Sequence, residues 1–332
     1  MKKIEIERFG GPEVLQVRDV PTPDPGPRDV LVQAHSIGVG WPDVYVRTGT
    51  YPWQHLFPMP ATPGVEMSGT VAAIGSQVER FAIGQPVYVS SGMLGMRGGC
   101  YAQARLVPED RLVALPPELD LDVAANLAYY QVALALLEEC SRGQTIGTVL
   151  VSGASGGMGT ALVQVAKALG HRVVATVGHD DKRAHSQAMG ADCVLNYRSA
   201  DVGPAIAAFT RGRGIDLWLE AYAGEKLADA LDHLAPWGKL VLYNATGGHP
   251  PASFFDAWRT HMAKCLSIQY FSMHIWEDDL PARRALIQRA VALMTSGRVR
   301  PPAGRHFPLD QASDAHRLLE SGRQVGRIFL RP

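Results

Sequence analysis

The sequence predicts an α/β protein of two domains, an all-β barrel-like unit followed by a parallel sheet that helices cover on both faces. The chain has 332 residues, which at roughly 150 residues per domain corresponds to about two domains. Residues 1 to about 115 read as short strands separated by proline and glycine. From residue 148 onward, apolar strands alternate with helices. These observations together define the predicted fold class.

The first part of the chain contains several candidate strands with turn residues between them. A Pro-rich break separates the first two, and the candidates are residues 14–17, 29–34, 69–74, 86–89 and 111–115. Many short strands of this kind are typical of a barrel-like unit. Near residue 122 the pattern changes to a helix-rich stretch.

The second part repeats a strand–helix alternation. Its candidate strands are residues 148–152, 172–177, 193–195, 216–220 and 239–242, with helices between them. Nearly continuous apolar strands spaced by helices indicate a parallel sheet that is buried on both faces. Beyond residue 270, the apolar spacing of residues 285–291 predicts a helix that Gly297 ends.

The composition excludes several classes of function. Lys and Arg number 32, as do Asp and Glu, so the formal net charge is zero. A protein that binds nucleic acid or a membrane surface usually carries an excess of cations, so neither partner is expected. The chain has no apolar run long enough for a spanning helix and no visible secretory signal.

The four cysteines, Cys100, Cys140, Cys193 and Cys265, are far apart and form no Cys-x-x-Cys pair. This spacing favours reduced thiols in a cytoplasmic protein and argues against a structural zinc lobe. Each cysteine is expected to behave as a small buried hydrophobe.

The strongest local signal is a glycine-rich turn that follows a strand and opens a helix, the context of a dinucleotide-binding site. Gly156 is expected to let the backbone approach a pyrophosphate, and Gly159 to let the helix pack on the strand. The N-terminus of the helix offers unpaired N–H groups to phosphate. A merely tight turn is the alternative. The predicted cofactor contacts are Ala154, Ser155, Gly156, Gly157, Met158 and Gly159.

The end of the next strand favours NADPH over NADH. Gly178 stands where an NAD enzyme carries an acidic residue for the ribose, and Lys182 follows shortly after. A missing carboxylate and a nearby cation suit a 2′-phosphate. Asp180 and Asp181 could supply the missing carboxylate for the ribose, or they simply form the first turn of a helix, where acidic residues suit the helix dipole. For Lys182, the alternative to phosphate binding is a solvated helix residue.

Motifs along nearly the whole chain resemble the medium-chain dehydrogenase/reductase superfamily, and within it the zinc-independent quinone oxidoreductase (zeta-crystallin-like) branch. The motifs are residues 38–52, the Pro-Gly-Val-Glu turn at 63–66, residues 153–159, 190–192 and 196–198, and the C-terminal segments 307–309, 315–316, 319–320 and 326–328.

The resemblance implies a domain plan and a cofactor. It implies a GroES-like β-barrel substrate domain over residues 1–122 and a Rossmann domain with a doubly wound parallel sheet over 123–270. Residues 271–332 would return to complete the substrate domain. Members of this branch usually use NADPH, bind it in a cleft beside the substrate, and are commonly homodimers.

The same resemblance implies further cofactor contacts. Lys182 and Tyr197 fall where the family contacts the 2′-phosphate. Asn244, Phe271 and Ser272 fall beside the nicotinamide, and Gln131 occupies a position that is often threonine.

Two tyrosines and a short aromatic segment are the candidates on the substrate side. Tyr45 and Tyr51 fall where the family has cleft tyrosines, whose hydroxyls donate to or polarise a carbonyl, with core packing as the alternative. Gly40, Trp41 and Trp53 are the predicted substrate-pocket residues. Gly40 departs from the asparagine usual in quinone oxidoreductases, which leaves the acceptor open, and the aromatic residues suggest an apolar or aromatic one.

No metal site is expected. The zinc alcohol dehydrogenases of the superfamily carry cysteine and histidine where this chain has Gly40 and Val65. Asp43 is expected to turn or cap its segment, and Glu66 to hold backbone or an arginine.

The expected activity is therefore zinc-independent hydride transfer from NADPH to an electron-poor small molecule, a quinone or an α,β-unsaturated carbonyl. Two alternatives remain open. One is an enoyl-thioester reductase that acts in trans on a carrier-bound chain, and the other is a non-catalytic, crystallin-like protein that binds NADPH.

Overall fold

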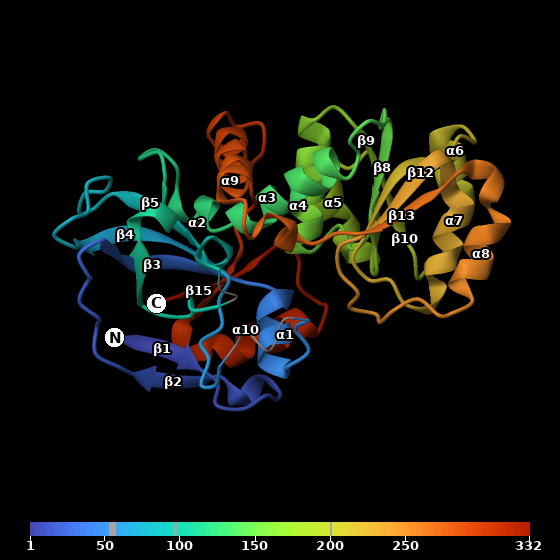
Figure 1. Ribbon diagram of the computed structural model, residues 1–332. Helices are drawn as coiled ribbons and strands as arrows, with labels where there is room; N and C mark the ends of the chain where they lie inside the picture. The colour runs from blue at the N-terminus through green and yellow to red at the C-terminus, as the bar shows by residue number, and fades with distance from the viewer. Residues whose placement is uncertain (53–57, 96–97, 200) are drawn as a thin grey trace. The chain divides into compact units, whose positions relative to one another are not determined.

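The computed structural model describes residues 1–52, 58–95, 98–199 and 201–332 (Figure 1). The chain forms two compact units. The first comprises Met1–Ala128 and Trp276–Pro332, and the second comprises Tyr129–Ile275.

The first unit is built on a seven-stranded sheet in the order β14-β15-β3-β4-β5-β7, with β6 paired to β3. All pairs are antiparallel except β14 with β15. The strands are β3 (Asp29–Val39), β4 (Glu66–Ile74), β5 (Pro86–Ser90), β6 (Ala104–Pro108), β7 (Val113–Ala114), β14 (Arg305–Pro308) and β15 (Ile328–Arg331).

Alternating apolar residues of these strands form one core. The inward-facing side chains of β3 are fully buried together with residues from β4, β5 and the C-terminal segments, because a strand turns successive side chains to opposite faces. The core includes Val30, Val32, Ile37, Met67, Val87, Ala315 and Ile328.

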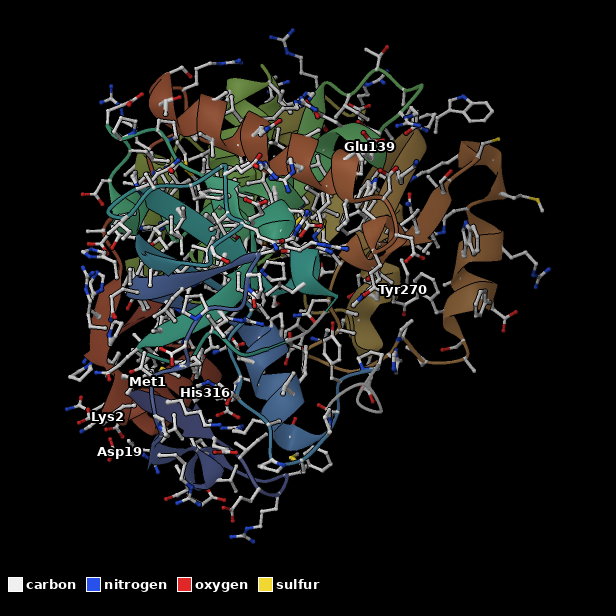
Figure 2. All side chains as sticks on the ribbon, turned by 60° about the vertical axis from the view of Figure 1, so that its left-hand side comes forward. Met1, Lys2, Asp19, Glu139, Tyr270 and His316 are labelled. Atoms are coloured by element: carbon white, nitrogen blue, oxygen red, sulfur yellow. The ribbon has the colours of Figure 1, made fainter. Side chains whose placement is uncertain are left out.

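Two further strands and several helices complete the first unit. β1 (Lys2–Glu5) and β2 (Gln16–Asp19) form a separate antiparallel pair in which Lys2 faces Asp19 (Figure 2). The helices are α1 (Trp41–Thr48), α2 (Leu121–Ala124), α9 (Leu280–Thr295) and α10 (Ala312–Glu320), with 3₁₀ turns η1 (Pro12–Val14), η3 (Ser91–Leu94), η4 (Glu109–Arg111) and η10 (Leu309–Gln311). The 3₁₀ turn η9 (Met273–Trp276) begins in the second unit and ends in the first.

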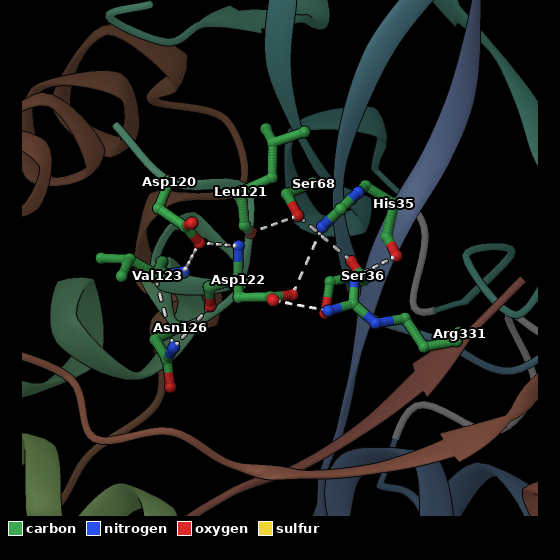
Figure 3. A network of polar contacts seen from close by, with 9 residues as sticks. All are labelled: His35, Ser36, Ser68, Asp120, Leu121, Asp122, Val123, Asn126 and Arg331. Carbon is green, nitrogen blue, oxygen red and sulfur yellow. Dashed lines mark hydrogen bonds and ion pairs between the residues drawn. The ribbon is translucent and has the colours of Figure 1, made fainter. Parts of the chain in front are cut away.

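The C-terminal segment is part of this sheet. β15 runs antiparallel to β3, with Ile328 opposite Val39. Arg331 pairs with Asp122 at the start of α2, and its Nη1 donates to the carbonyl of His35 at 3.0 Å (Figure 3). Residues from the two ends of the chain therefore build one sheet.

Charged side chains join α10 to α1. The Arg47 guanidinium donates twice to the Glu320 carboxylate, at 3.0 and 2.6 Å. His316 of α10 is fully buried, with Nε2 3.0 Å from the Tyr101 hydroxyl. Burial lowers the pKa of His316 to about 3, so the imidazole is neutral in the folded protein.

The second unit contains a six-stranded parallel sheet in the order β10-β9-β8-β11-β12-β13. This is the doubly wound Rossmann order, in which the winding direction reverses between β8 and β11. The strands are β8 (Thr148–Val151), β9 (Arg172–Val177), β10 (Cys193–Asn196), β11 (Ile215–Glu220), β12 (Leu234–Leu242) and β13 (Ser267–Tyr270). The predicted α/β fold class is thus confirmed.

Helices cover both faces of this sheet, α4 and α5 on one and α6, α7 and α8 on the other (Figure 1). The covered strands are almost wholly apolar; all of β8 is buried. The helices are α3 (Leu127–Leu134), which begins at the end of the first unit, α4 (Gly157–Ala168), α5 (Arg183–Ala188), α6 (Gly203–Thr210), α7 (Asp229–His233) and α8 (Phe254–Thr260). A π-helical segment, η5 (Ala135–Glu139), follows α3, and the 3₁₀ turns are η6 (Asp180–Lys182), η7 (Glu225–Ala228) and η8 (Met262–Lys264).

Some elements were not predicted. α1 contains a proline in its first turn, where that residue is tolerated, and Gly49 ends it with a φ of 74°. β13 is short and lies at the end of the strand order, where its side chains are only partly buried. Its sequence therefore lacks the continuous apolar run of the central strands. The expectation that all four cysteines are buried is confirmed for Cys100 and Cys140 and was wrong for Cys193, which is half-buried, and for Cys265, which is exposed.

In the part of the chain that the structure describes, no helix is both long and apolar enough to cross a membrane.

Candidate cofactor and active site

The glycine-rich turn lies between β8 and α4, at the carboxyl end of β8. Gly153 has a φ of 60°, which favours glycine. Ala154 and Ser155 are buried, and the Ala154 N–H donates to the carbonyl of Thr176 in β9 at 3.0 Å. Ala154 and Ser155, the first two predicted cofactor contacts, are therefore packed into the protein, and the turn leads directly into α4.

Gly156 and Gly159 are glycines for different reasons. A Cβ on Gly159 would lie 2.4 Å from the Gly153 oxygen and 2.6 Å from the Ala154 Cα, so this position is crowded by backbone. A Cβ on Gly156 would meet only the Gly153 oxygen, at 3.6 Å, an ordinary contact. Gly156 also has an unstrained φ of −77°. No neighbouring atom among the described residues crowds position 156, so the backbone there is open to the approach of a ligand.

The N-terminus of α4 is suited to phosphate. α4 extends over Gly157–Ala168, and its N-cap Gly156 makes no side-chain capping hydrogen bond. The N–H groups of the first turn, which includes Gly157 and Met158, are orphan donors at the positive end of the helix dipole. Together with the open space at Gly156, this end of α4 fits a pyrophosphate group.

The carboxyl ends of β9 and β10 bring two cations and a histidine together. Gly178 follows β9, and a Cβ there would lie 3.0 Å from the Tyr197 hydroxyl and 3.6 Å from Arg198 Nε. Nη1 of Arg198 is 3.2 Å from Nε2 of His179. Lys182 lies in η6. Burial lowers the pKa of Lys182, and the nearby charge of Arg198 lowers it further. The two cations, Lys182 and Arg198, form a cation cluster, with His179 in contact with Arg198.

The structure decides the open questions about this segment. The Lys182 side chain is buried, so the interpretation of a solvated helix residue was wrong. Asp180 and Asp181 form the first turn of η6, where acidic residues suit the helix dipole. Sequence reasoning did not assign Arg198 and His179 to the site, although a cation directly after Tyr197 was an available signal.

The residues predicted beside the nicotinamide follow two neighbouring strands. Asn244 comes after β12, and its side-chain oxygen accepts from the Ala245 N–H at 2.9 Å. Phe271 follows β13 and donates its N–H to Leu242 of β12 at 2.8 Å. Ser272 Oγ accepts from the His274 N–H at 3.2 Å.

Gln131 lies on α3 and is buried. Its side-chain oxygen makes no hydrogen bond among the described residues. A buried amide oxygen without a partner is costly, so this position has an acceptor to offer to a ligand.

On the first unit, α1 carries an aromatic pair. The Trp41 and Tyr45 rings lie one turn apart, with centroids 5.8 Å apart and planes tilted by 35°. Tyr51 packs against the hydrophobic core of this unit. Gly40 is the extended N-cap of α1. Trp53, the third predicted pocket residue, lies outside the described residues.

Buried carboxylates hold this segment in place. Asp43 accepts from the N–H groups of Gly40 and Gly64, both at 2.9 Å, so it ties α1 to the turn at residues 63–66. Burial raises the pKa of Asp43 to about 7. Glu66 accepts from the Tyr88 hydroxyl and the Ala128 N–H, each at 2.8 Å, and pairs with Arg327. Both carboxylates are thus structural, as the sequence suggested.

No group of three or more histidine, cysteine, aspartate or glutamate side chains that could hold a metal ion occurs among residues 1–52, 58–95, 98–199 and 201–332.

Comparisons with known proteins agree with this architecture. The profile of the alcohol dehydrogenase GroES-like domain matches residues 26–117, and that of zinc-binding dehydrogenases matches residues 189–330. A quinone oxidoreductase of Sus scrofa is 32% identical, with 99% of this chain and 97% of that protein covered. One of Pseudomonas aeruginosa is 30% identical, with 100% and 99% covered. The crystal structure of Escherichia coli quinone oxidoreductase complexed with NADPH matches with a TM-score of 0.88 at 25% identity, covering all of both chains.

The fold and these matches define a medium-chain dehydrogenase/reductase with a GroES-like domain. The chain belongs to the quinone oxidoreductase family of that superfamily and is an oxidoreductase enzyme. The family resemblance noted in the sequence is thereby confirmed.

Proposed function

We propose that this enzyme transfers a hydride from NADPH to an electron-poor small molecule, a quinone or an α,β-unsaturated carbonyl. The observation that carries the proposal is the carboxyl edge of the second unit, where the open Gly156 and the uncapped start of α4 adjoin a cation cluster. The similar Escherichia coli enzyme was crystallised with NADPH, which supports the choice of cofactor.

Each part of this edge has a proposed role. The first-turn N–H groups of α4, in Gly157 and Met158, bind the pyrophosphate. Lys182, Arg198 and the Tyr197 hydroxyl bind the 2′-phosphate, since charge-assisted hydrogen bonds are stronger than neutral ones. Arg198 also has a planar guanidinium that suits phosphate oxygens.

Asn244, Phe271, Ser272 and Gln131 are proposed to orient the nicotinamide ring. When bound, NADPH supplies the hydride. Gln131 has a buried oxygen that can accept from the amide of the carboxamide group.

On the substrate side, we place the Tyr45 hydroxyl as the donor to the oxygen that becomes an enolate. A donor aimed at developing negative charge stabilises the transition state. Tyr51 packs against the core and is the weaker candidate. Gly40 and Trp41 form part of the pocket, and the Trp41–Tyr45 ring pair favours a planar, apolar acceptor.

We also propose that the enzyme is a homodimer that acts in the cytoplasm. β13 ends the strand order of the six-stranded sheet, and Tyr270 on it is 61% exposed (Figure 2). An exposed edge strand with an apolar side chain favours pairing with a second copy. The four cysteines are free thiols, which suits a reducing compartment.

The test is oxidation of NADPH and NADH, side by side, with a panel of quinones, enones and crotonyl thioesters. Wild type should prefer NADPH and reduce quinones or enones. Turnover of thioesters alone would support a carrier-linked enoyl reductase, and NADPH binding without any turnover would support a non-catalytic protein.

Variants of the cation cluster test the cofactor assignment. Lys182→Ala and Arg198→Ala should each lower the NADPH-to-NADH ratio of kcat/KM by about ten- to a hundredfold, because one charge-assisted hydrogen bond contributes about 1.5–3 kcal/mol. Arg183→Ala is the matched control, since this exposed arginine pairs with Asp180 at 3.7 Å. An unchanged preference in both cluster variants would refute the assignment.

A further inference from the structure

Glu220 is a carboxylate at the last position of β11 with only 7% of its surface exposed. β11 pairs with β8, and the winding of the sheet reverses between these two strands. Ligands of such sheets bind outside the carboxyl ends of the strands at this reversal. Glu220 therefore lies beneath the place where the cofactor is proposed to cross the sheet.

The two carboxylate oxygens of Glu220 serve different parts of the protein. Oε1 accepts from the Ser152 hydroxyl at 3.0 Å and from the N–H groups of Tyr222 and Ala223 at 2.6 and 3.2 Å. Oε2 accepts from Trp218 Nε1 at 3.0 Å, within the core of the sheet. One oxygen thus faces the loops at the edge, and the other faces the interior.

Ser152 connects Glu220 to the glycine-rich turn. It directly precedes Gly153, whose φ of 60° starts the turn. Its Oγ donates to Glu220 and accepts from the Ala221 N–H at 2.9 Å. The hydroxyl therefore ties the turn after β8 to the loop after β11.

The loop after β11 depends on the same carboxylate. Ala223 has a φ of 57° and Gly224 one of 80°, and a left-handed alanine is held only by surrounding contacts. This loop pairs with the loop after β12, through the Gly247 N–H to the Tyr222 oxygen at 2.8 Å. Asn244, a proposed nicotinamide contact, belongs to that second loop. Glu220 thus joins two loops at the cofactor edge directly and reaches the loop after β12 through Tyr222.

We propose that Glu220 is a positioning residue for the cofactor: through Ser152 it fixes the glycine-rich turn against the loop after β11, so that the N–H groups of α4 are already aimed at the pyrophosphate. Preorganised donors bind more tightly because their ordering is complete before binding. This inference rests on the proposed cofactor site.

Three variants separate positioning from simple stability, with the dissociation constant of NADPH measured by its fluorescence and unfolding measured by urea. Ser152→Ala removes the two hydrogen bonds that tie the turn to the loop after β11, those with Glu220 and with the Ala221 N–H. It should raise the dissociation constant and the KM for NADPH about tenfold, since a hydrogen bond to a charged group contributes at least about that factor, while kcat at saturation and the KM of the acceptor stay unchanged. Trp218→Phe removes the interior hydrogen bond and part of a ring that stacks on His233, but it leaves Ser152 in place. It should lower stability while leaving NADPH affinity within about twofold.

Glu220→Gln is the conservative variant. Its amide oxygen can serve Ser152, Tyr222 and Ala223, while its amide nitrogen faces the Trp218 N–H. NADPH affinity should therefore be near that of wild type and stability lower, whereas Glu220→Ala should lose affinity at least as strongly as Ser152→Ala.

The outcomes are distinguishable. If Ser152→Ala binds NADPH like wild type, or Trp218→Phe weakens binding as much as Ser152→Ala does, the positioning role is refuted and the proposed cofactor site stands. If wild type itself does not bind NADPH, both the cofactor site and the role of Glu220 are refuted.

Discussion

Replacing glycine by alanine should have opposite effects at positions 156 and 159, weakening cofactor binding at the first and stability at the second. An alanine Cβ at 159 would lie 2.4 Å from the Gly153 oxygen and 2.6 Å from the Ala154 Cα, so backbone must move. Overpacking of this kind costs about 1–3 kcal/mol, against a gain of about 1 kcal/mol from replacing a helical glycine. Gly159→Ala should therefore lower the free energy of unfolding by up to about 2 kcal/mol.

At 156 the same methyl group has room, since its nearest neighbour is 3.6 Å away and the φ of −77° suits alanine. Gly156→Ala should leave stability unchanged or raise it by about 0.4–1 kcal/mol, because the unfolded chain loses freedom. Its cost should appear on binding. A methyl group between the backbone and the pyrophosphate lengthens charge-assisted hydrogen bonds of about 1.5–3 kcal/mol, which corresponds to about a ten- to hundredfold higher dissociation constant.

The assay is a pair of measurements on each variant, urea unfolding without cofactor and NADPH titration followed by fluorescence. The expected pattern is a stable Gly156→Ala that binds weakly and a destabilised Gly159→Ala. A Gly156→Ala variant that binds NADPH like wild type would show that no phosphate approaches this backbone, and the account of the turn would be wrong.

Three further predictions concern the proton donor, a buried carboxylate and the assembly. Tyr45→Phe should lower kcat about a hundredfold by removing the proposed donor, measured by steady-state NADPH oxidation, whereas Tyr51→Phe should change it little; equal losses would contradict the choice of Tyr45. Because burial raises the Asp43 pKa from 3.8 to about 7, folding binds a proton there, and the stability this contributes is present below about pH 4 and lost as pH rises to about 7. Asparagine does not titrate, so the difference in free energy of unfolding between Asp43→Asn and wild type should shift by about 4 kcal/mol in favour of the variant from about pH 4 to about pH 7, at 1.36 kcal/mol per pKa unit. Urea titrations at both pH values measure this difference, and the same difference at both would refute the raised pKa. Tyr270→Asp should convert the proposed dimer to a monomer in light scattering, because a charge on an edge strand opposes pairing; a dimer that persists would exclude this edge.

The cofactor turn could be predicted because its signal is local. A strand, a glycine-rich turn and a helix follow one another within residues 148–169, and the backbone requirements at Gly153 and Gly159 belong to that segment alone. The parallel sheet was predictable for the same reason, since each buried strand carries its own apolar run.

Other parts of the site depend on which strands become neighbours. Arg198 joins Gly178 and His179 because β10 pairs with β9, and Glu220 joins Ser152 because β11 pairs with β8. Sequence spacing does not encode these pairs, because strands pair through backbone groups that every residue has.

The sequence by itself therefore determined the α/β class, the family and the type of cofactor turn. Only the tertiary structure decided that Lys182 is buried near the charge of Arg198, that Tyr51 packs against the core while Tyr45 pairs with Trp41, and that Asp43 is enclosed enough to titrate near neutral pH. The physical reason is that burial, charge proximity and unpaired polar atoms arise from contacts between residues far apart in the chain, and these contacts exist only once the sheets have formed.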